Sequence, residues 1–148
     1  MSILLREYDN KDFEIVKGIL FEAFPEVEDL LERSMTTSET LNLDKKKYIQ
    51  LVAEEDGKVV GYALASRSSD PILIRTNLWI DYVCVSSEHR GKGIAKQLMK
   101  KIEEIAVSEK VLFLQLTSSR FRTGARKLYT DLGFEIRESD IFRKVLEW

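Results

Sequence analysis

The stretch that decides the fold is Glu88-His89-Arg90-Gly91-Lys92-Gly93-Ile94-Ala95-Lys96. An apolar run precedes it at 79–85, and a pattern of helical spacing follows it at 94–107. We therefore expect a strand that leads through a glycine turn into a helix. The free N–H groups and the dipole of such a helix start favour an anion. Gly91 and Gly93 lack a Cβ, so the backbone there can approach a phosphate closely.

This turn predicts a phosphate or pyrophosphate site that differs from two common nucleotide motifs. The Gly-x-Gly-x-x-Gly pattern is absent because Lys96 stands at the third glycine position. The P-loop pattern is absent because no Ser or Thr follows Lys92. Arg90, Lys92 and Lys96 add positive charge. The alternative interpretation is a solvated, basic helix start that binds nothing.

Length and composition predict one domain over residues 1–148. A chain of this length can bury a core without disulfides or metal. Hydrophobic residues make up 44% and charged residues 32%, which is typical of a soluble globular protein. The formal net charge of -2 does not favour nucleic acid as the main partner.

The single cysteine and the single histidine restrict the chemistry. Cys84 stands alone in an apolar run, which excludes a disulfide framework and fits a reducing compartment. His89 is the only histidine, which argues against a multi-histidine metal site. No apolar run approaches the roughly 20 residues of a membrane span, and the N-terminus lacks a signal-peptide core. We predict a cytoplasmic protein with neither a metal nor a membrane partner.

The order of the expected elements is β-α-α-β-β-β-α-β-α-β-β. This order predicts an α/β fold (α+β by some schemes) with a mixed, mostly antiparallel sheet of about seven strands and about four flanking helices. The helix at 94–107 should connect the strands at 79–85 and 111–116 as a parallel pair. The other strands are expected at 2–8, 48–54, 59–65, 134–136 and 142–146, and the other helices at 10–24, 26–35 and 123–132.

Short local signals place several element ends. Asp9 or Asn10 can cap the first helix, and Pro25 should stop it. The pair Asp56-Gly57 predicts a hairpin turn. Thr123 is the expected cap of the last helix, and Gly133 should end it.

A second motif lies downstream, Ala125-Arg126-Lys127-Leu128-Tyr129-Thr130-Asp131-Leu132-Gly133-Phe134. Together with 90–95, it resembles the GCN5-related N-acetyltransferase (GNAT) family. The first stretch matches the Q/R-x-x-G-x-G/A acetyl-CoA signature, and the second resembles A-x-x-L/F-Y-x-x-x-G-F. The resemblance covers nearly the whole chain in element order, and its specific part runs from Ile80 to Phe134.

The resemblance implies that acetyl-CoA is the co-substrate and that its acetyl group passes directly to a primary amine. The turn would hold the CoA pyrophosphate, and strand 83–85 would pair with the pantetheine arm where it splays from 111–116. An N–H near Val83 would polarise the thioester carbonyl. Ala125 would leave room for the arm, and Tyr129 would lie near the sulfur. The implied cofactor-binding residues are Val83, Cys84, Val85, Arg90, Gly91, Lys92, Gly93, Ile94, Ala95, Lys96, Arg122, Ala125 and Tyr129.

One position departs from the family pattern. Arg122 stands where the family often has an Asn that contacts the cofactor arm. The resemblance therefore leaves two roles open for Arg122, namely contact with a CoA phosphate and contact with an anionic group of the acceptor.

Two residues are the candidate catalytic groups. An alkylamine has a pKa of about 10 and must lose a proton before it attacks, whereas the leaving thiolate gains from a proton donor. Tyr129 is the candidate acid; the alternative is a core aromatic, and both roles can hold. Asp81 is the candidate base, since strand alternation places it on one face with Val83 and Val85. The alternative for Asp81 is an ion pair with Arg75 or Arg120.

Other functions stay open at this point. A non-catalytic acyl-CoA-binding or sensing domain would keep the same cofactor contacts. A toxin that acetylates aminoacyl-tRNA would need a basic face, which the net charge disfavours. The acceptor, a small-molecule or peptide amine, is not identified; the acidic segment 24–29, with Phe24, Glu26, Glu28 and Asp29, could favour a cationic one. Because members of the family that the chain resembles are often dimers through their last strands, residues 141–148 could form a homodimer contact.

Overall fold

The computed structural model describes residues 2–147. The chain forms two compact units, Met1–Thr117 and Ser118–Trp148. A single domain over 1–148 and a dimer contact through 141–148 stay predictions, and Trp148 lies outside the described residues.

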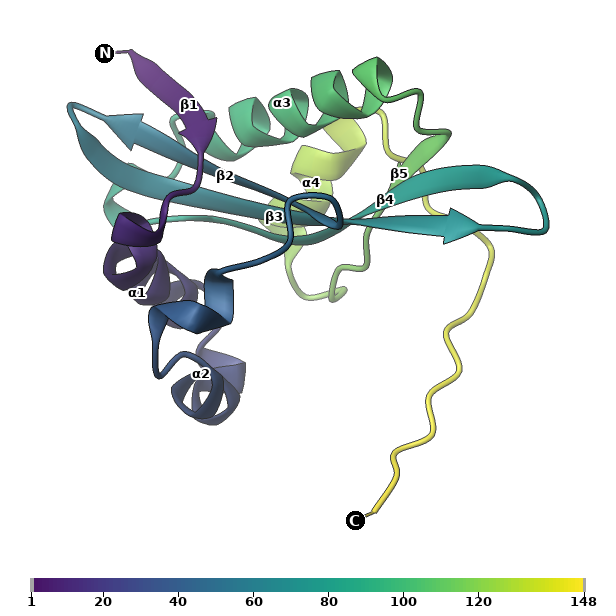
Figure 1. Cartoon of the computed structure of the whole chain (residues 1–148), viewed down its shortest axis with the longest axis horizontal. Helices are drawn as coiled ribbons and strands as arrows, with labels where there is room; N and C mark the ends of the chain where they lie inside the picture. The colour runs from purple at the N-terminus through teal and green to yellow at the C-terminus, as the bar shows by residue number, and fades with distance from the viewer. Residues whose placement is uncertain (1, 148) are drawn as a thin grey trace. The chain divides into compact units, whose positions relative to one another are not determined.

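The first unit is built on a mixed five-stranded sheet in the order β1-β2-β3-β4-β5 (Figure 1). The neighbours from β1 to β4 pair antiparallel, whereas β4 and β5 pair parallel, as the βαβ spacing predicts. The strands are β1 Ile3–Glu7, β2 Tyr48–Glu55, β3 Lys58–Asp70, β4 Arg75–Val85 and β5 Phe113–Gln115.

The hairpin between β2 and β3 turns at Asp56-Gly57, as predicted. Both residues have positive φ values, 52° and 78°, the conformation that Asp-Gly favours in a two-residue hairpin turn. Glu55 and Lys58 face each other across this turn. The register shifts between Ala53 and Glu54.

One face of the sheet is covered by α1 (Phe13–Ala23) and α2 (Glu28–Ser34) (Figure 1). Asp9 caps the short 3-10 turn before α1, and Asp12 completes a capping box. Pro25 lies just after α1, as predicted. The buried cluster on this face is formed by Phe13, Val16, Ile19, Leu20, Leu31, Met35, Leu41, Val52, Val59, Tyr62 and Cys84.

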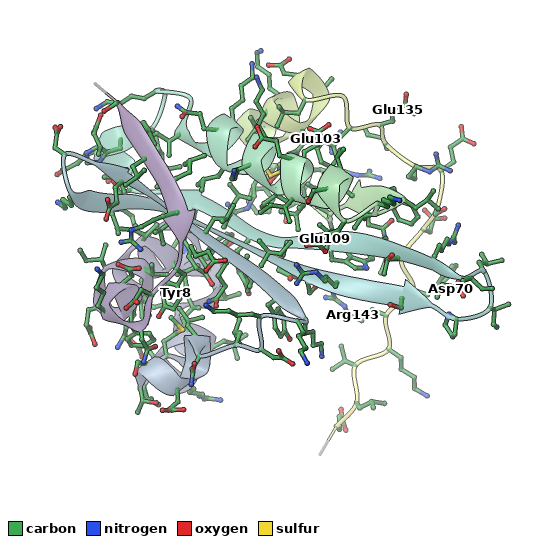
Figure 2. All side chains as sticks on the ribbon, turned by 45° about the horizontal axis from the view of Figure 1, so that its top comes forward. Tyr8, Asp70, Glu103, Glu109, Glu135 and Arg143 are labelled. Atoms are coloured by element: carbon green, nitrogen blue, oxygen red, sulfur yellow. The ribbon has the colours of Figure 1, made fainter. Side chains whose placement is uncertain are left out.

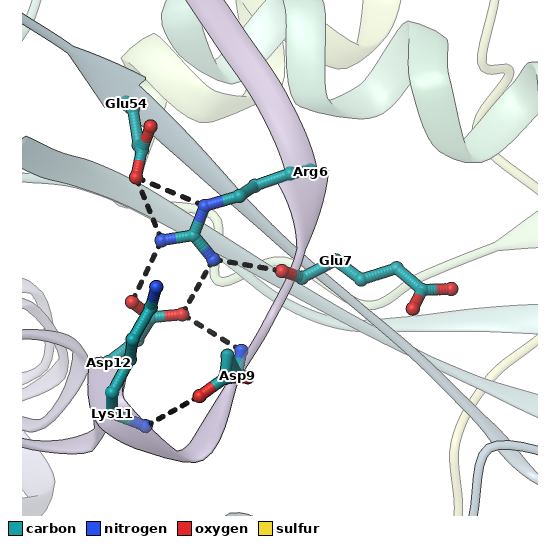
Figure 3. A network of polar contacts seen from close by, with 6 residues as sticks. All are labelled: Arg6, Glu7, Asp9, Lys11, Asp12 and Glu54. Carbon is teal, nitrogen blue, oxygen red and sulfur yellow. Dashed lines mark hydrogen bonds and ion pairs between the residues drawn. The ribbon is translucent and has the colours of Figure 1, made fainter. Parts of the chain in front are cut away.

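A network of charged side chains joins β1, β2 and the start of α1 (Figure 3). The Arg6 guanidinium donates to both carboxylate oxygens of Asp12, at 2.8 and 2.9 Å, and to Glu54 Oε1 at 2.8 and 3.0 Å. Asp12 is only 5% exposed, and the Arg6 hydrogen bond lowers the pKa of its carboxyl group. The network therefore stabilises charges that would be costly to bury alone.

The opposite face is covered by α3 (Ile94–Ser108) (Figure 1). Its buried side chains recur at helical spacing, and Ile94, Leu98 and Ile102 are nearly inaccessible. After its last turn, Glu109 accepts two hydrogen bonds from Arg67 of β3, at 2.8 and 2.7 Å (Figure 2). The Arg67–Glu109 pair thus ties the end of α3 to the sheet, and the buried side chain of Ile94 ties its start.

The second unit contains α4 (Thr123–Asp131). Thr123 was expected to cap this helix, but it is the first helical residue, and Arg122 stands at the cap position without a side-chain cap bond. Gly133 has a φ of 88° and follows the helix end, as predicted.

The prediction of about seven strands was wrong. Residues 134–147 form no strand, and their apolar side chains are exposed; Ile136 is 81% and Phe142 95% exposed. Alternating apolar residues indicate a strand only where a neighbouring strand supplies hydrogen bonds, and none of the described residues pairs with this segment.

None of the helices in residues 2–147 combines the length and the apolar character needed to cross a membrane.

Candidate functional site

The glycine turn between β4 and α3 has the geometry of an open anion cradle. Gly91 and Gly93 have φ values of 77° and 78°, which side chains rarely adopt. Gly93 is the N-cap of α3, and no side-chain cap bond closes the helix start. Ile94 is 1% exposed and anchors the first turn in the core. The first N–H groups of a fifteen-residue helix are therefore available to an anion.

The basic residues of the turn make contacts that the sequence did not predict. Arg90 Nε donates to the Val85 carbonyl oxygen at 3.2 Å, which ties the turn to the end of β4. Lys92 Nζ lies 3.5 Å from Glu55 Oε2 at the end of β2. Lys96 is exposed on the first turn of α3. Arg90 thus anchors the turn.

The preceding short 3-10 segment, Ser87–His89, is held by α1. The Ser87 N–H and Oγ both donate to the carboxylate of Glu22. These bonds lower the pKa of Glu22, so the carboxylate stays charged and bound. The loop before the turn is therefore fixed from the helix side of the sheet.

One edge of β4 is unpaired where the resemblance places the pantetheine arm. Pairing with β5 is limited to three residues and ends at Trp79 opposite Gln115. Within residues 2–147, no strand pairs with 80–85 on that edge, although β3 pairs with it on the other. Val83 and Val85 therefore present backbone groups to an extended ligand on that edge, as in β-strand addition, whereas the backbone groups of Cys84 point toward β3.

Asp81 lies in a β-bulge of β4. Tyr82 pairs with Leu64 and Ile80 pairs with Ala65, so Asp81 is the extra residue. Unbroken alternation, on which the predicted face of Asp81 depended, is therefore interrupted. Burial raises the pKa of the Asp81 carboxyl group, and a hydrogen bond from Ser66 opposes that shift.

The alternative ion pair of Asp81 with Arg75 is not formed. Arg75 Nε instead lies 3.8 Å from Asp70 Oδ2, near the tip of the hairpin between β3 and β4 (Figure 2). Asp81 itself is exposed and lies at a bulge, a feature that often marks functional sites. Its role as the base and the alternative ion pair with Arg120 both stay predictions.

Two cavities lie near the predicted acceptor segment. The larger, about 410 Å³, is lined only by residues of 25–33, including Glu26, Glu28 and Asp29. The smaller, about 150 Å³, lies between the sheet and α2 and includes Leu64 and Tyr82 in its wall. The Tyr82 ring packs edge-on against Phe24, with centroids 5.4 Å apart. Sequence reasoning missed the smaller cavity because distant segments form it.

The second unit carries Arg122, Ala125 and Tyr129. Ala125 and Tyr129 are four residues apart on α4 and so share a helix face. Burial raises the pKa of the Tyr129 hydroxyl, and the charge of Arg122 opposes the shift. Tyr129 therefore keeps its proton at neutral pH, as a general acid must. Its ring also packs edge-on against Phe134, so packing and chemistry can coexist.

The Cys84 thiol is a buried, weakly acidic group. Its side chain is 5% exposed, and burial raises the pKa of the thiol to about 12. The side chains of residues 2–147 form no acidic, histidine or cysteine cluster that could hold a metal ion.

The chain is similar to known acetyltransferases in sequence and in fold. The model of the acetyltransferase (GNAT) family matches residues 9–134. N-acetyltransferase 8B of Mus musculus is 39% identical over 84 residues, which cover 57% of this chain and 36% of that protein. N-acetyltransferase 8 of Mus musculus is 36% identical over 97 residues, which cover 66% of this chain and 42% of that protein. The chain thus spans about two fifths of the curated relatives it matches.

Solved structures share the fold at low sequence identity. A possible acetyltransferase from Clostridium difficile 630 has a TM-score of 0.84 and 22% identity, and the match covers 100% of both chains. The aminoglycoside N-acetyltransferase AAC(6')-Iy in complex with CoA has a TM-score of 0.78 and 22% identity, covering 97% of this chain and 95% of that one. On the family match over 9–134, this chain belongs to the GNAT acetyltransferase family.

Proposed function

We propose that this chain transfers the acetyl group of acetyl-CoA to a primary amine of a small molecule or peptide. The observation that carries the proposal is the open N-terminus of α3, with two left-handed glycines, at the end of a strand whose edge is unpaired. The N-acetyltransferase relatives support the same activity.

The residues of this region fit acetyl-CoA, which supplies the thioester when bound. Backbone N–H groups of 90–95 would hold the pyrophosphate, and exposed Lys96 would add charge. The free edge of Val83–Val85 would bind the pantetheine amides, and a Val83 N–H would polarise the carbonyl. Arg122 and Ala125 are proposed cofactor contacts on motif grounds alone.

Two side chains would move protons. Asp81, in its deprotonated form, would take a proton from the acceptor's ammonium group, directly or through water, and the neutral amine would then attack the thioester carbonyl. Tyr129 would donate its hydroxyl proton to the departing sulfur. The raised pKa of Asp81 makes its carboxylate a stronger base than an ordinary carboxylate. The raised pKa of Tyr129 keeps its hydroxyl protonated at neutral pH, as a proton donor requires.

The acceptor would approach from the side of α1 and α2. Tyr82, next to Asp81, helps to wall the smaller cavity, and Glu26, Glu28 and Asp29 line the larger one. An amine with an apolar substituent would use the smaller cavity, and a polycationic amine would use the larger one. The structural neighbour AAC(6')-Iy, an aminoglycoside N-acetyltransferase in complex with CoA, makes a polycationic acceptor worth testing.

The test is release of CoA thiol from acetyl-CoA in the presence of a panel of apolar amines, aminoglycosides and peptides. We expect turnover with at least one class, and a large loss with Tyr129→Phe and with Asp81→Asn. CoA binding without turnover on any amine would favour the sensing domain. Unchanged turnover in both variants would show that the assigned acid and base are wrong. A cytoplasmic location and a homodimer stay predictions.

A further inference from the structure

A buried carboxylate lies directly behind the glycine turn. Glu55 ends β2 and is 7% exposed. Its Oε2 atom lies 3.1 Å from His89 Nε2 and 3.5 Å from Lys92 Nζ. One side chain of β2 therefore contacts two residues of the stretch that connects β4 to α3.

The second ring nitrogen of His89 is also bonded. His89 Nδ1 lies 2.6 Å from Ser86 Oγ, and the Ser86 N–H donates to the Val60 carbonyl oxygen at 2.8 Å. A neutral imidazole can donate from Nε2 to Glu55 and accept from the Ser86 hydroxyl. An imidazolium can donate to both, so the contacts persist in either protonation state.

The turn needs such an anchor because it contains two glycines in left-handed conformations. Glycine loses more backbone entropy on ordering than any other residue. A ligand that had to order Gly91 and Gly93 on binding would therefore bind more weakly than one that met a fixed turn. Lys92 lies between these glycines, and Glu55 holds its ammonium group.

We propose that Glu55 and His89 are positioning residues that pre-organise the turn for the pyrophosphate of acetyl-CoA. The inference rests on the proposed use of acetyl-CoA by this chain. Neither residue would touch the reacting atoms; Glu55 would act through the side chains of His89 and Lys92, and His89 through Glu55 and Ser86.

Charge alone and pre-organisation predict opposite changes in CoA affinity when Glu55 is replaced. Glu55 places a negative charge behind an anion site, so its removal would tighten CoA binding if charge alone mattered. If pre-organisation matters more, the same substitution weakens CoA binding. The direction of the change therefore separates the two explanations.

The test compares Glu55→Gln, His89→Ala and the double variant. We expect the Kd for CoA and the KM for acetyl-CoA to rise about tenfold, with kcat at saturation nearly unchanged. The double variant should lose little more CoA affinity than either single variant, because the two residues act as one unit. His89→Gln, which can still donate to Glu55, should recover part of the affinity.

A second acetyl donor distinguishes positioning from general structural support. S-acetylpantetheine lacks the pyrophosphate, so kcat/KM for this donor should hardly change in the variants. Glu104→Gln is the matched control, since Glu104 is 70% exposed and forms an exposed ion pair with Lys101 along α3. It should leave both donors unaffected.

Three outcomes would overturn the inference. Unchanged or tighter CoA binding in Glu55→Gln would refute pre-organisation. Equal losses with acetyl-CoA and S-acetylpantetheine, accompanied by a lower melting temperature, would show a merely structural role. A wild-type protein that binds no CoA at all would refute the proposed function itself, which calorimetry on the wild type detects before any variant is made.

Discussion

Gly61 of β3 faces Ile94 at the start of α3 so closely that a Cβ atom on Gly61 would lie 3.2 Å from Ile94 Cγ2. The same atom would lie 3.2 Å from Leu98 Cδ1. Gly93, the N-cap, directly precedes Ile94. The absence of a side chain at Gly61 therefore sets how deeply the first turn of α3, and with it the anion cradle, lies against the sheet.

Replacing Gly61 should disturb both stability and cofactor binding. We expect Gly61→Ala to lower the free energy of unfolding by about 1–3 kcal/mol, the usual cost of overpacking a core. Because α3 must shift, the KM for acetyl-CoA should rise as well. Urea unfolding and steady-state kinetics measure the two effects. Gly18→Ala is the control, since a Cβ on Gly18 meets nothing within 4 Å; a Gly61→Ala protein as stable as wild type would contradict this packing.

The left-handed conformation of Gly93 should be required for CoA binding. A side chain in this conformation costs about 1–2 kcal/mol, so Gly93→Ala should either strain the turn or change its φ. We expect weaker CoA binding by calorimetry together with a loss of stability. Gly133→Ala introduces the same kind of strain after α4, where φ is 88°, and should lower stability while it leaves CoA affinity nearly intact. Equal effects of both variants on CoA affinity would argue against the cradle.

The raised pKa of Asp81 predicts the acid side of the rate profile. A general base works only when deprotonated, so kcat/KM for the amine should fall as the pH drops through the pKa of Asp81. Burial raises that pKa, so the fall should begin at a higher pH than for an ordinary carboxyl group. Asp81→Asn should be a slower enzyme, and its kcat/KM should no longer fall over this acidic pH range. A variant that retains the same limb would show that another group is the base.

The Arg6 network predicts a pH-dependent loss of stability. Arg6→Met leaves the buried carboxylate of Asp12 without its guanidinium partner, which should cost about 3–5 kcal/mol at neutral pH. The pKa of Asp12 is lowered in the folded protein, so its stabilising effect is present above the ordinary carboxyl pKa and is lost as the pH falls through the lowered value.

Chemical denaturation across pH checks this prediction. The difference in the free energy of unfolding between wild type and Arg6→Met should be largest near neutral pH and should decrease in acid. Lys101→Met, which removes an exposed pair on α3, should change stability by less than about 0.5 kcal/mol. A gap that stays constant from neutral to acidic pH would show that the Asp12 charge is not what Arg6 stabilises.

The parts of the fold that local sequence determines were predicted well. The Asp56-Gly57 turn and the glycine turn before α3 depend on residues whose backbone preferences are intrinsic. The parallel pairing of β4 with β5 follows from the handedness of a βαβ unit. These features need no knowledge of distant contacts.

The parts that depend on distant contacts could not be predicted. Glu55 lies 34 positions before His89, and no local pattern links a hairpin carboxylate to that imidazole. The bulge at Asp81 arises from the register between β3 and β4 rather than from a residue preference. The last two expected strands were wrong because alternation at 134–146 does not supply a pairing partner.

The most direct measurement follows both products of the proposed reaction. Acetyl-CoA carrying an isotope-labelled acetyl group is incubated with the protein and each amine that releases CoA thiol, and the products are analysed by mass spectrometry. We predict that labelled N-acetylated amine accumulates in step with free CoA, and that both depend on Tyr129 and Asp81. Free CoA without acetylated amine, which would be thioester hydrolysis, or CoA binding with neither product, would contradict the assignment of N-acetyl transfer.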